Sequence, residues 1–295
     1  MKKLLFVVNP IANGTDKADI TGYLSGKAAE TGYAVHILET SGSDDVQAVQ
    51  QKVKNIEPEL IVVGGGDGTV QMLCTALYKI DCKTTVGILP LGSANGLATS
   101  LGLAQNAREA VDWIFENPNS QDFDLLQVNN KYCCVHLLDM GLNAALVKRY
   151  ENSDSRGILG YAKHVFDALK TREETHFDLQ LDGEAHKKSG QLLVCTNANR
   201  YGTGVALTSG KPNDGLLDLR VIPKVNLEEL IQGGLTLVDL FSEQLKEDSL
   251  QGRELSIQVN RPIPLQIDGE FIGDVKKVEV RVLPNAIKMR FPDGE

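Results

Sequence analysis

The sequence predicts an α/β protein of two domains, in which an N-terminal, doubly wound, mostly parallel α/β domain is followed by an antiparallel β-sandwich domain. Three observations support this prediction. Short apolar strands alternate with helical patterns from residue 1 to about 124. Strand-like pieces dominate from about residue 125 onward. Finally, 295 residues suffice for two cores of about 150 residues each.

The N-terminal strands are apolar nearly throughout, and each is followed by a helical pattern. The expected strands are 4–10, 33–40, 59–65 and 84–90, and the expected helices between them are 16–30, 44–56 and 70–80. Such a succession indicates a parallel sheet covered on both faces. Ligands of these sheets bind beyond the carboxyl ends of the strands. We therefore expect function in the loops NPIANGT, GGGDGT and PLGSANG, which follow three of the strands.

The C-terminal pattern indicates an antiparallel sandwich or barrel, interrupted by helical patterns near 159–170 and 227–246. We expect the first domain to comprise residues 1–124, completed by 285–295, and the second domain to comprise 125–284. No repeat or long linker separates the two halves.

Composition excludes several classes of function. A net charge of −9 and a pI near 5.2 argue against electrostatic binding of nucleic acid, and they require any contact with an anionic membrane to be local. Five cysteines without CxxC spacing predict reduced, structural thiols of a cytosolic protein. The N-terminal apolar run stops at Pro10, and no apolar segment of 18 residues follows, so we expect neither export nor a membrane span.

The stretch GGGDGTV, residues 64–70, has the glycines of a phosphate-binding loop but fits neither common motif. Thr69 stands where GxGxxG requires its third glycine, and the GK[ST] ending of a Walker loop is absent. Thr69 could instead cap the helix that follows. The loop therefore leads into a helix N-terminus, where a phosphate could bind.

Asp67 places a carboxylate in the middle of this glycine loop. Its presence is explained if a hard cation bridges it to phosphates, because Mg²⁺ is usually held by one or two carboxylates with phosphate oxygens and waters. It could also orient a hydroxyl nucleophile. The alternative is that Asp67 only satisfies backbone donors of the turn.

Two further stretches carry candidate polar groups. PLGSANGLA, residues 90–98, ends another expected parallel strand, and its Ser93 could meet the same phosphates. QIDGE, residues 266–270, places Asp268 and Glu270 around a glycine. Taken alone, this last stretch is more typical of a hairpin turn than of a site.

The ordered set of motifs resembles the catalytic domain of the diacylglycerol-kinase-type lipid kinases. The set consists of NP…G, GGDGT, a G-[ST]-x-N loop, DGLLD and a late DGE, and it covers essentially the whole chain. This family includes soluble bacterial lipid kinases and sphingosine kinases, and NAD kinases are more distant relatives. The resemblance implies transfer of the γ-phosphate of MgATP to a lipid hydroxyl, in a cleft between the two domains.

The resemblance also implies roles for particular residues. Glu270 matches the catalytic base, and Asp67 would serve the metal and the geometry of transfer. The nucleotide-binding positions would be Asn9, Thr40, Gly65, Gly66, Asp67, Gly68, Thr69, Val70, Ser93 and Asn95. One departure is Gly96, which stands where many bacterial members have an aspartate.

A second Mg²⁺ is implied by SGKPNDGLLDLR, residues 209–220, which resembles a segment that binds a structural cation in some bacterial members. The carboxylate of Asp214 and the carbonyls of Lys211 and Leu216 would be its ligands. The alternative is a tight turn before a strand.

The sequence does not identify the lipid that would accept the phosphate. The segment 226–245 would either pack in the core or line a lipid entry groove. We expect a cytoplasmic protein that contacts the membrane surface transiently to reach its lipid substrate. We expect no binding of nucleic acid. A homo-oligomer is compatible with the sequence. The alternatives are a NAD kinase, and a nucleotide-binding sensor without kinase activity. Gly96 favours the sensor, and Glu270 speaks against it.

Overall fold

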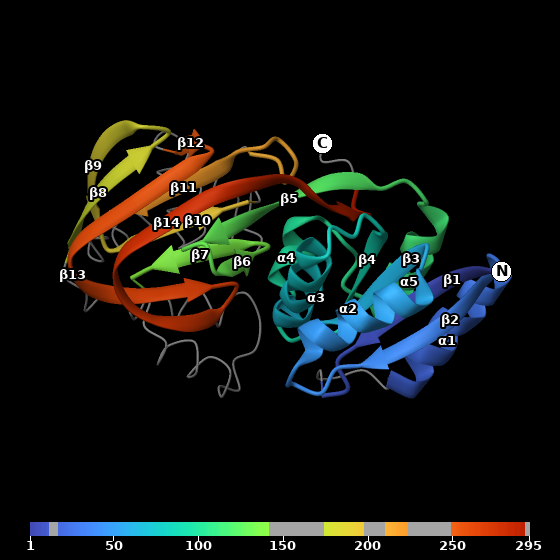
Figure 1. Ribbon diagram of the computed structural model, residues 1–295. Coiled ribbons are helices and arrows are strands. Elements are labelled where there is room, and N and C mark those ends of the chain that lie inside the picture. The colour runs from blue at the N-terminus through green and yellow to red at the C-terminus, as the bar shows by residue number, and fades with distance from the viewer. Residues whose placement is uncertain (12–16, 142–173, 198–209, 224–248, 293–295) are drawn as a thin grey trace, which may run out of the picture. The chain divides into compact units, whose positions relative to one another are not determined.

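The computed structural model describes residues 1–11, 17–141, 174–197, 210–223 and 249–292 (Figure 1). These residues form two compact units. Unit 1 comprises 1–124 together with 284–295, and unit 2 comprises 125–283. The chain passes from one unit to the other within two strands, β5 (Gln121–Val128) and β14 (Glu270–Met289).

Unit 1 is built on a parallel sheet in the order β4-β3-β1-β2. Its strands are β1 (Lys2–Val8), β2 (Tyr33–Glu39), β3 (Leu60–Gly65) and β4 (Thr85–Pro90). The end of β14 joins this sheet beside β4, where Met289 lies opposite Val86 in parallel register. The C-terminal end of β14 therefore extends the sheet to which β1 belongs.

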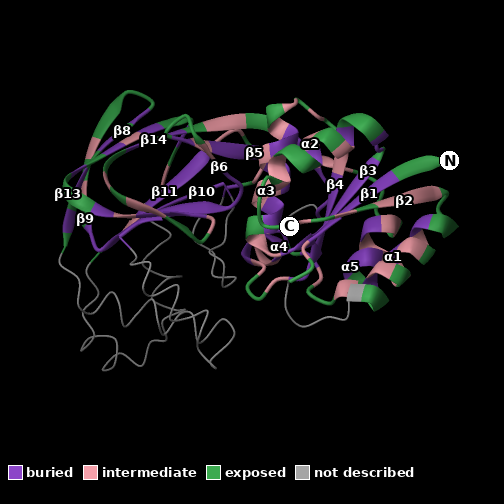
Figure 2. Ribbon diagram, turned by 60° about the horizontal axis from the view of Figure 1, so that its bottom comes forward, coloured by how far each residue is buried: buried purple, intermediate pink, exposed green. Residues whose placement is uncertain are grey.

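The described part of unit 1 contains five helices, and four of them pack in two pairs. The five are α1 (Lys17–Glu30), α2 (Asp45–Ile56), α3 (Asp67–Lys79), α4 (Gly96–Ser100) and α5 (Ala107–Glu116). Helix α1 packs with α5, and α2 packs with α3. Because strand side chains alternate between faces, Leu4 and Phe6 of β1 join the core beneath α1 and α5. Figure 2 shows β1, β3 and β4 largely buried, whereas β2 at the edge is mostly intermediate.

The expected elements of unit 1 agree with the structure to within one residue, except at β1, which spans Lys2–Val8 where 4–10 was expected, and at the start of α3. The helix begins at Asp67, three residues earlier than expected, and Gly66 is its N-cap without any side-chain capping bond. The interpretation of Thr69 as the cap is therefore wrong. Thr69 lies in the first turn and is buried, because Gly66 already adopts the extended conformation from which the helix starts.

Unit 2 is an antiparallel, sandwich-like domain around one apolar core. Its other strands are β6 (Tyr132–Cys134), β7 (Leu137–Met140), β8 (Thr175–Leu181), β9 (Glu184–Gly190), β10 (Leu192–Thr196), β11 (Leu217–Ile222), β12 (Leu250–Gly252) and β13 (Glu254–Ile267). The long strand β13 pairs with β8 near its start, with β7 near its end, and with β14 along most of its length. The helical patterns expected near 159–170 and 227–246 lie outside the described residues.

Two Asp–Gly turns close hairpins in unit 2. Asp182–Gly183 joins β8 to β9 with φ angles of 49° and 87°, and Asp268–Gly269 joins β13 to β14 with 48° and 86°. Two consecutive positive φ angles are the signature of the type I′ turn, which matches the twist of the flanking strands. Asp and Gly tolerate this conformation better than other residues do.

The sequence predicts no membrane-spanning segment and reduced cysteines. No helix in the described ranges is both long and apolar enough to cross a membrane. All five cysteines are free thiols, and four of them are buried.

Candidate active site

The loops that follow the parallel strands of unit 1 meet at one edge of the sheet. The N–H of Asn9, after β1, donates to the carbonyl of Gly64 at 2.9 Å. The N–H of Thr40, after β2, donates to the carbonyl of Val8 at 2.9 Å. Candidate residues from four strands are thus held at the carboxyl edge, where such sheets bind their ligands.

Glycines allow the loops after β3 and β4 to approach each other closely. A Cβ added to Gly66 would lie 3.3 Å from the Cα of Gly92, and a Cβ on Gly92 would overlap the backbone of Gly66. A Cβ on Gly65 would overlap the side chain of Thr69. These positions therefore require glycine for contact, and the contact brings two loops of backbone into one surface.

The N-terminus of α3 presents unused backbone donors. The carbonyl of Gly66 accepts the N–H groups of Thr69 and Val70 at 3.0 and 3.2 Å. Within the described residues, the N–H groups of Gly66, Asp67 and Gly68 donate no hydrogen bond. Three free donors at a helix N-terminus form a site suited to an anion. Thr69 and Val70 are buried and support the loop from beneath.

Asp67 links the two glycine loops through its carboxylate. One oxygen accepts the N–H of Gly96 and the other accepts the N–H of Leu97, each at 2.9 Å. These donors are the first residues of α4, so Asp67 satisfies helix-terminal N–H groups that would otherwise lack a partner. The contact uses only the backbone at position 96, which explains why glycine suffices there for this purpose.

Asn95 and Ser93 differ in their surroundings. Asn95 has a φ of 50°, and its amide closes the loop by accepting the N–H of Gly92 at 2.8 Å and donating to the carbonyl of Gly92 at 3.0 Å. Ser93 is exposed at the tip of the loop. Asn95 therefore shapes the loop, and Ser93 is the side chain that remains open to a ligand.

Glu270 lies in unit 2, as the first residue of β14, and it is exposed. Its neighbour Asp268 is instead held by the segment between β6 and β7, as described below. Burial raises the pKa of the Asp268 carboxyl, and the backbone N–H groups that it accepts oppose this increase.

The chain contains Asp-Gly-Glu at two further places, at 182–184 in the other type I′ hairpin and at 293–295, outside the described residues. Glu184 begins β9 as Glu270 begins β14, and both glutamates are exposed. The local structure of the motif is therefore a hairpin turn at both of its described places. The tripeptide alone does not single out Glu270, whose expected role comes from the family resemblance of the stretch QIDGE.

The predicted cation loop is closed by hydrogen bonds of Asp214. Its carboxylate accepts the N–H groups of Lys211 and Leu216, both at 2.9 Å. Those are the residues whose carbonyls are expected to be co-ligands, so the observed contacts also fit the tight-turn alternative. In the described ranges, no group of three or more His, Cys, Asp or Glu side chains could hold a metal.

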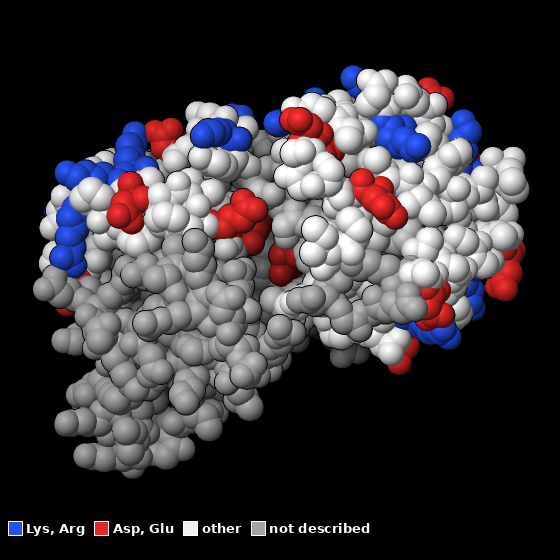
Figure 3. All heavy atoms as spheres, turned by 90° about the horizontal axis from the view of Figure 1, so that it is seen from below, with Lys and Arg blue, Asp and Glu red and all other residues white. Residues whose placement is uncertain are grey.

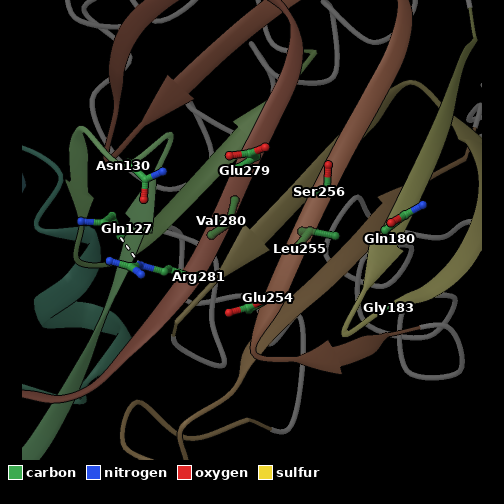
Figure 4. Close-up of a pocket in the computed structure, with 10 residues that line it drawn as sticks. All are labelled: Gln127, Asn130, Gln180, Gly183, Glu254, Leu255, Ser256, Glu279, Val280 and Arg281. Atoms are coloured by element: carbon green, nitrogen blue, oxygen red, sulfur yellow. Dashed lines mark hydrogen bonds between the residues drawn. The ribbon is translucent and has the colours of Figure 1, made fainter.

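A cavity of about 410 Å³ in unit 2 contains none of the predicted site residues (Figure 4). Gln127, Asn130, Gln180, Gly183, Glu254, Leu255, Ser256, Glu279, Val280 and Arg281 line it. It lies at the far end of the β13–β14 ladder from Glu270. Figure 3 shows both acidic and basic side chains on the described part of the face in view.

Two family models match the chain in succession. The model of the diacylglycerol kinase catalytic domain matches residues 3–128, and the model of the YegS C-terminal NAD kinase beta sandwich-like domain matches residues 137–291. The chain belongs to the diacylglycerol-kinase-type lipid kinases. Membership of this family of kinases, which use a hydroxyl acceptor, confirms the resemblance and disfavours the NAD kinase alternative.

Relatives extend over nearly the whole lipid kinase chain. A probable lipid kinase YegS of Salmonella paratyphi A is 26% identical over 274 residues, which cover 89% of this chain and 88% of that protein. The crystal structure of a diacylglycerol kinase from Bacillus anthracis has a TM-score of 0.78 at 21% identity, covering 99% of this chain and 97% of that one. A putative diacylglycerol kinase from the same organism has a TM-score of 0.77 at 23% identity. The structures support the two-domain fold.

Sequence reasoning missed the close approach of Gly92 to Gly66 and the contacts of Asp268. Gly92 could have been found in PLGSANG, because a glycine that follows a buried strand permits close approach. The sequence places Asp268 in a hairpin turn and gives it no further role. Its contacts with residues more than 130 positions away left no signal in the sequence.

Proposed function

We propose that this lipid kinase transfers the γ-phosphate of ATP to a hydroxyl of a membrane lipid. The observation that supports nucleotide binding best is the set of unused N–H groups at Gly66, Asp67 and Gly68. Together with the helix dipole, they favour a phosphate chain at the start of α3. The absence of side chains at Gly66 and Gly92 would let phosphates approach the backbone.

Asp67 is the carboxylate that borders this cradle, and it fits a Mg²⁺ ion that arrives with the nucleotide. Such an ion needs only one or two carboxylates when phosphate oxygens and waters complete its shell. When bound, Mg²⁺ supplies neutralisation of the charge on the phosphoryl group. Asp67 would contribute a ligand oxygen while its bonds to Gly96 and Leu97 keep the two loops together.

Glu270 is proposed as the base. As the lipid oxygen bonds to the γ-phosphorus, the bond from phosphorus to the β–γ bridging oxygen breaks, ADP leaves, and the hydroxyl proton passes to Glu270. We infer that unit 1 holds the nucleotide and that unit 2 holds the lipid. The lipid acceptor also implies transient contact with the membrane surface.

The test is a panel of lipids, with NAD included, incubated with labelled ATP. Transfer to at least one lipid is expected. Transfer to NAD alone would establish the NAD kinase alternative, and ATP binding without any transfer would establish the sensor.

Two matched substitutions then test the base. Glu270→Gln should lower turnover by about 10²–10⁴-fold, the range of general-base catalysis, with ATP affinity within about threefold of wild type. Glu184→Gln changes the same motif in the other hairpin and should leave turnover unchanged. Equal rates for the wild type and Glu270→Gln would move the base elsewhere.

A further inference from the structure

The carboxylate of Asp268 holds the tip of the β13–β14 hairpin against a distant segment of unit 2. It accepts the backbone N–H groups of Val135 at 2.8 Å, His136 at 2.9 Å and Leu137 at 3.1 Å. The backbone N–H of Asp268 in turn donates to the carbonyl of Leu137 at 2.9 Å. The turn itself does not require these bonds, because an Asp–Gly pair readily adopts the positive φ angles of a type I′ turn.

A thiol adds a fourth donor to this carboxylate. Cys134 Sγ lies 3.4 Å from Asp268 Oδ1, and Cys134 is fully buried. Burial raises the pKa of the Cys134 thiol well above its usual range, so the thiol keeps its proton and remains a donor. Asp268 thus binds the whole turn 134–137, which precedes β7.

Glu270 depends on these contacts for its position. It follows Asp268 by two residues and pairs with Ile267 across the turn. In the described part of the chain, its exposed side chain forms no hydrogen bond or ion pair of its own. Only the backbone of the hairpin tip places its carboxylate, and Asp268 fixes that tip.

We propose that Asp268 is the positioning residue for Glu270, acting through its clamp on residues 134–137. The proposal rests on the proposed role of Glu270 as base. Base catalysis requires the carboxylate within hydrogen-bond reach of the hydroxyl, and a displacement of about 1 Å can cost roughly 100-fold in rate. A looser tip would therefore lower the rate of transfer and leave nucleotide binding intact.

Asp182 provides a matched control for the turn. It occupies the same position in the other Asp–Gly hairpin, and its carboxylate accepts the N–H of Arg253 at 3.0 Å and the N–H of Glu254 at 2.8 Å. Asp182→Asn therefore removes the same kind of contact from the same unit, at the opposite end of β13 from Glu270.

The experiment measures kcat, KM for ATP and melting temperature for Asp268→Asn and Asp182→Asn in the full chain. The amide keeps the size of the side chain but opposes a backbone N–H with its own NH₂ group. We expect Asp268→Asn to lower kcat by about 10–100-fold with KM for ATP unchanged. Asp182→Asn should lower the melting temperature to a similar extent without a change in kcat.

A double-mutant cycle separates positioning from general destabilisation. If Asp268 acts through Glu270, the Asp268→Asn change should cause no further loss of kcat in a Glu270→Gln background. Losses that multiply in the double variant would overturn the proposal, as would a folded Asp268→Asn protein with a wild-type kcat. If the Asn variant does not fold, Asp268→Ser enters the same cycle with one acceptor oxygen retained.

The rate of the Glu270→Gln variant distinguishes failure of the proposed base from failure of the proposed positioning role of Asp268. A wild-type rate in that variant would refute the assigned base, and positioning with it. A strongly reduced rate in that variant, together with an unaffected Asp268→Asn, would refute positioning alone and leave the proposed function standing.

Discussion

Asp67 joins two roles in one side chain. Its oxygens accept the first N–H groups of α4, while its own N–H belongs to the unused donors of α3. The residue therefore organises the backbone that would receive the phosphates, whether or not it also ligates a cation. Substitution of Asp67 should therefore change two quantities that can be measured separately, the stability of the loops and the rate of catalysis.

We expect Asp67→Asn to lower kcat by about 100-fold or more, the scale of losing a positioned electrostatic group. Because the amide retains only one acceptor, one N–H of α4 should also lose its partner, at a cost of about 1–3 kcal/mol in unfolding free energy. Steady-state kinetics and denaturant unfolding measure the two effects. Asp182→Asn should reproduce only the loss of stability, and a folded Asp67→Asn with normal turnover would contradict the role.

Gly92→Ala should separate the loops after β3 and β4. The new methyl group would overlap the backbone of Gly66 and lie 2.8 Å from the side-chain oxygen of Asn95, and backbone cannot move aside as a flexible side chain can. ATP affinity, measured by calorimetry, should fall by at least about tenfold. This decrease corresponds to a loss of about 1.4 kcal/mol of binding free energy. Gly22→Ala is the control, because nothing lies within 4 Å of its added Cβ in helix α1.

The Gly22→Ala control should be neutral or stabilising. Alanine is favoured over glycine in a helix interior by about 0.5–1 kcal/mol. An unchanged ATP affinity in both variants would show that the close contact of the two glycine loops is not required for binding.

At the scale of elements, loops built around a carboxylate recur in both units. Asp45 accepts the N–H groups of Ser41 and Gly42 before α2, as Asp214 accepts those of Lys211 and Leu216 before β11. The two loops share a hydrogen-bonding scheme, and only the second carries the family resemblance to a cation site. A comparison of the two therefore separates turn chemistry from metal binding.

We expect EDTA to lower the melting temperature of the wild type in the absence of ATP. A cation that binds only the native state at 100 times its Kd stabilises it by about 2.7 kcal/mol. Asp214→Ala should abolish the response, and Asp45→Ala should retain it. A response that persists in Asp214→Ala would place the metal elsewhere, and no response in the wild type would leave Asp214 as a turn residue.

At the scale of the whole molecule, unit 1 is discontinuous in sequence. Residues 284–295 return to it through several contacts. The N–H of Asn285 donates to Asp124 at 2.7 Å, the N–H of Arg290 donates to the carbonyl of Val86 at 2.8 Å, and the rings of Phe123 and Phe291 lie 6.1 Å apart, edge to face. The final segment therefore completes both the sheet and the core of unit 1.

A fragment of residues 1–124 should consequently fail to fold as a cooperative unit. The same fragment joined by a short flexible linker to 284–295 should regain a cooperative thermal transition, because the edge of β4 is then paired and Phe123 is covered. Circular dichroism melting of both fragments measures this. Equal cooperativity in the two would show that the last segment adds little to unit 1.

The sequence by itself determined much of this kinase. The apolar runs of β1, β3 and β4, each followed by a helix, predict a doubly wound sheet, because strands buried on both faces have no polar alternation. The glycines of GGGDGT and PLGSANG predict where backbone approaches a ligand. These features follow from local periodicity and local conformational freedom, which a single sequence records directly.

Only the tertiary structure decided which polar groups serve one another. Asp67 meets the N-terminus of α4 about 30 residues away, and Asp268 meets the turn before β7 more than 130 residues away. The two Asp-Gly-Glu hairpins have the same local sequence and differ in what each aspartate holds. Partners so distant in sequence are chosen by sheet order and register, which arise from the packing of the whole unit and not from any single stretch of the chain.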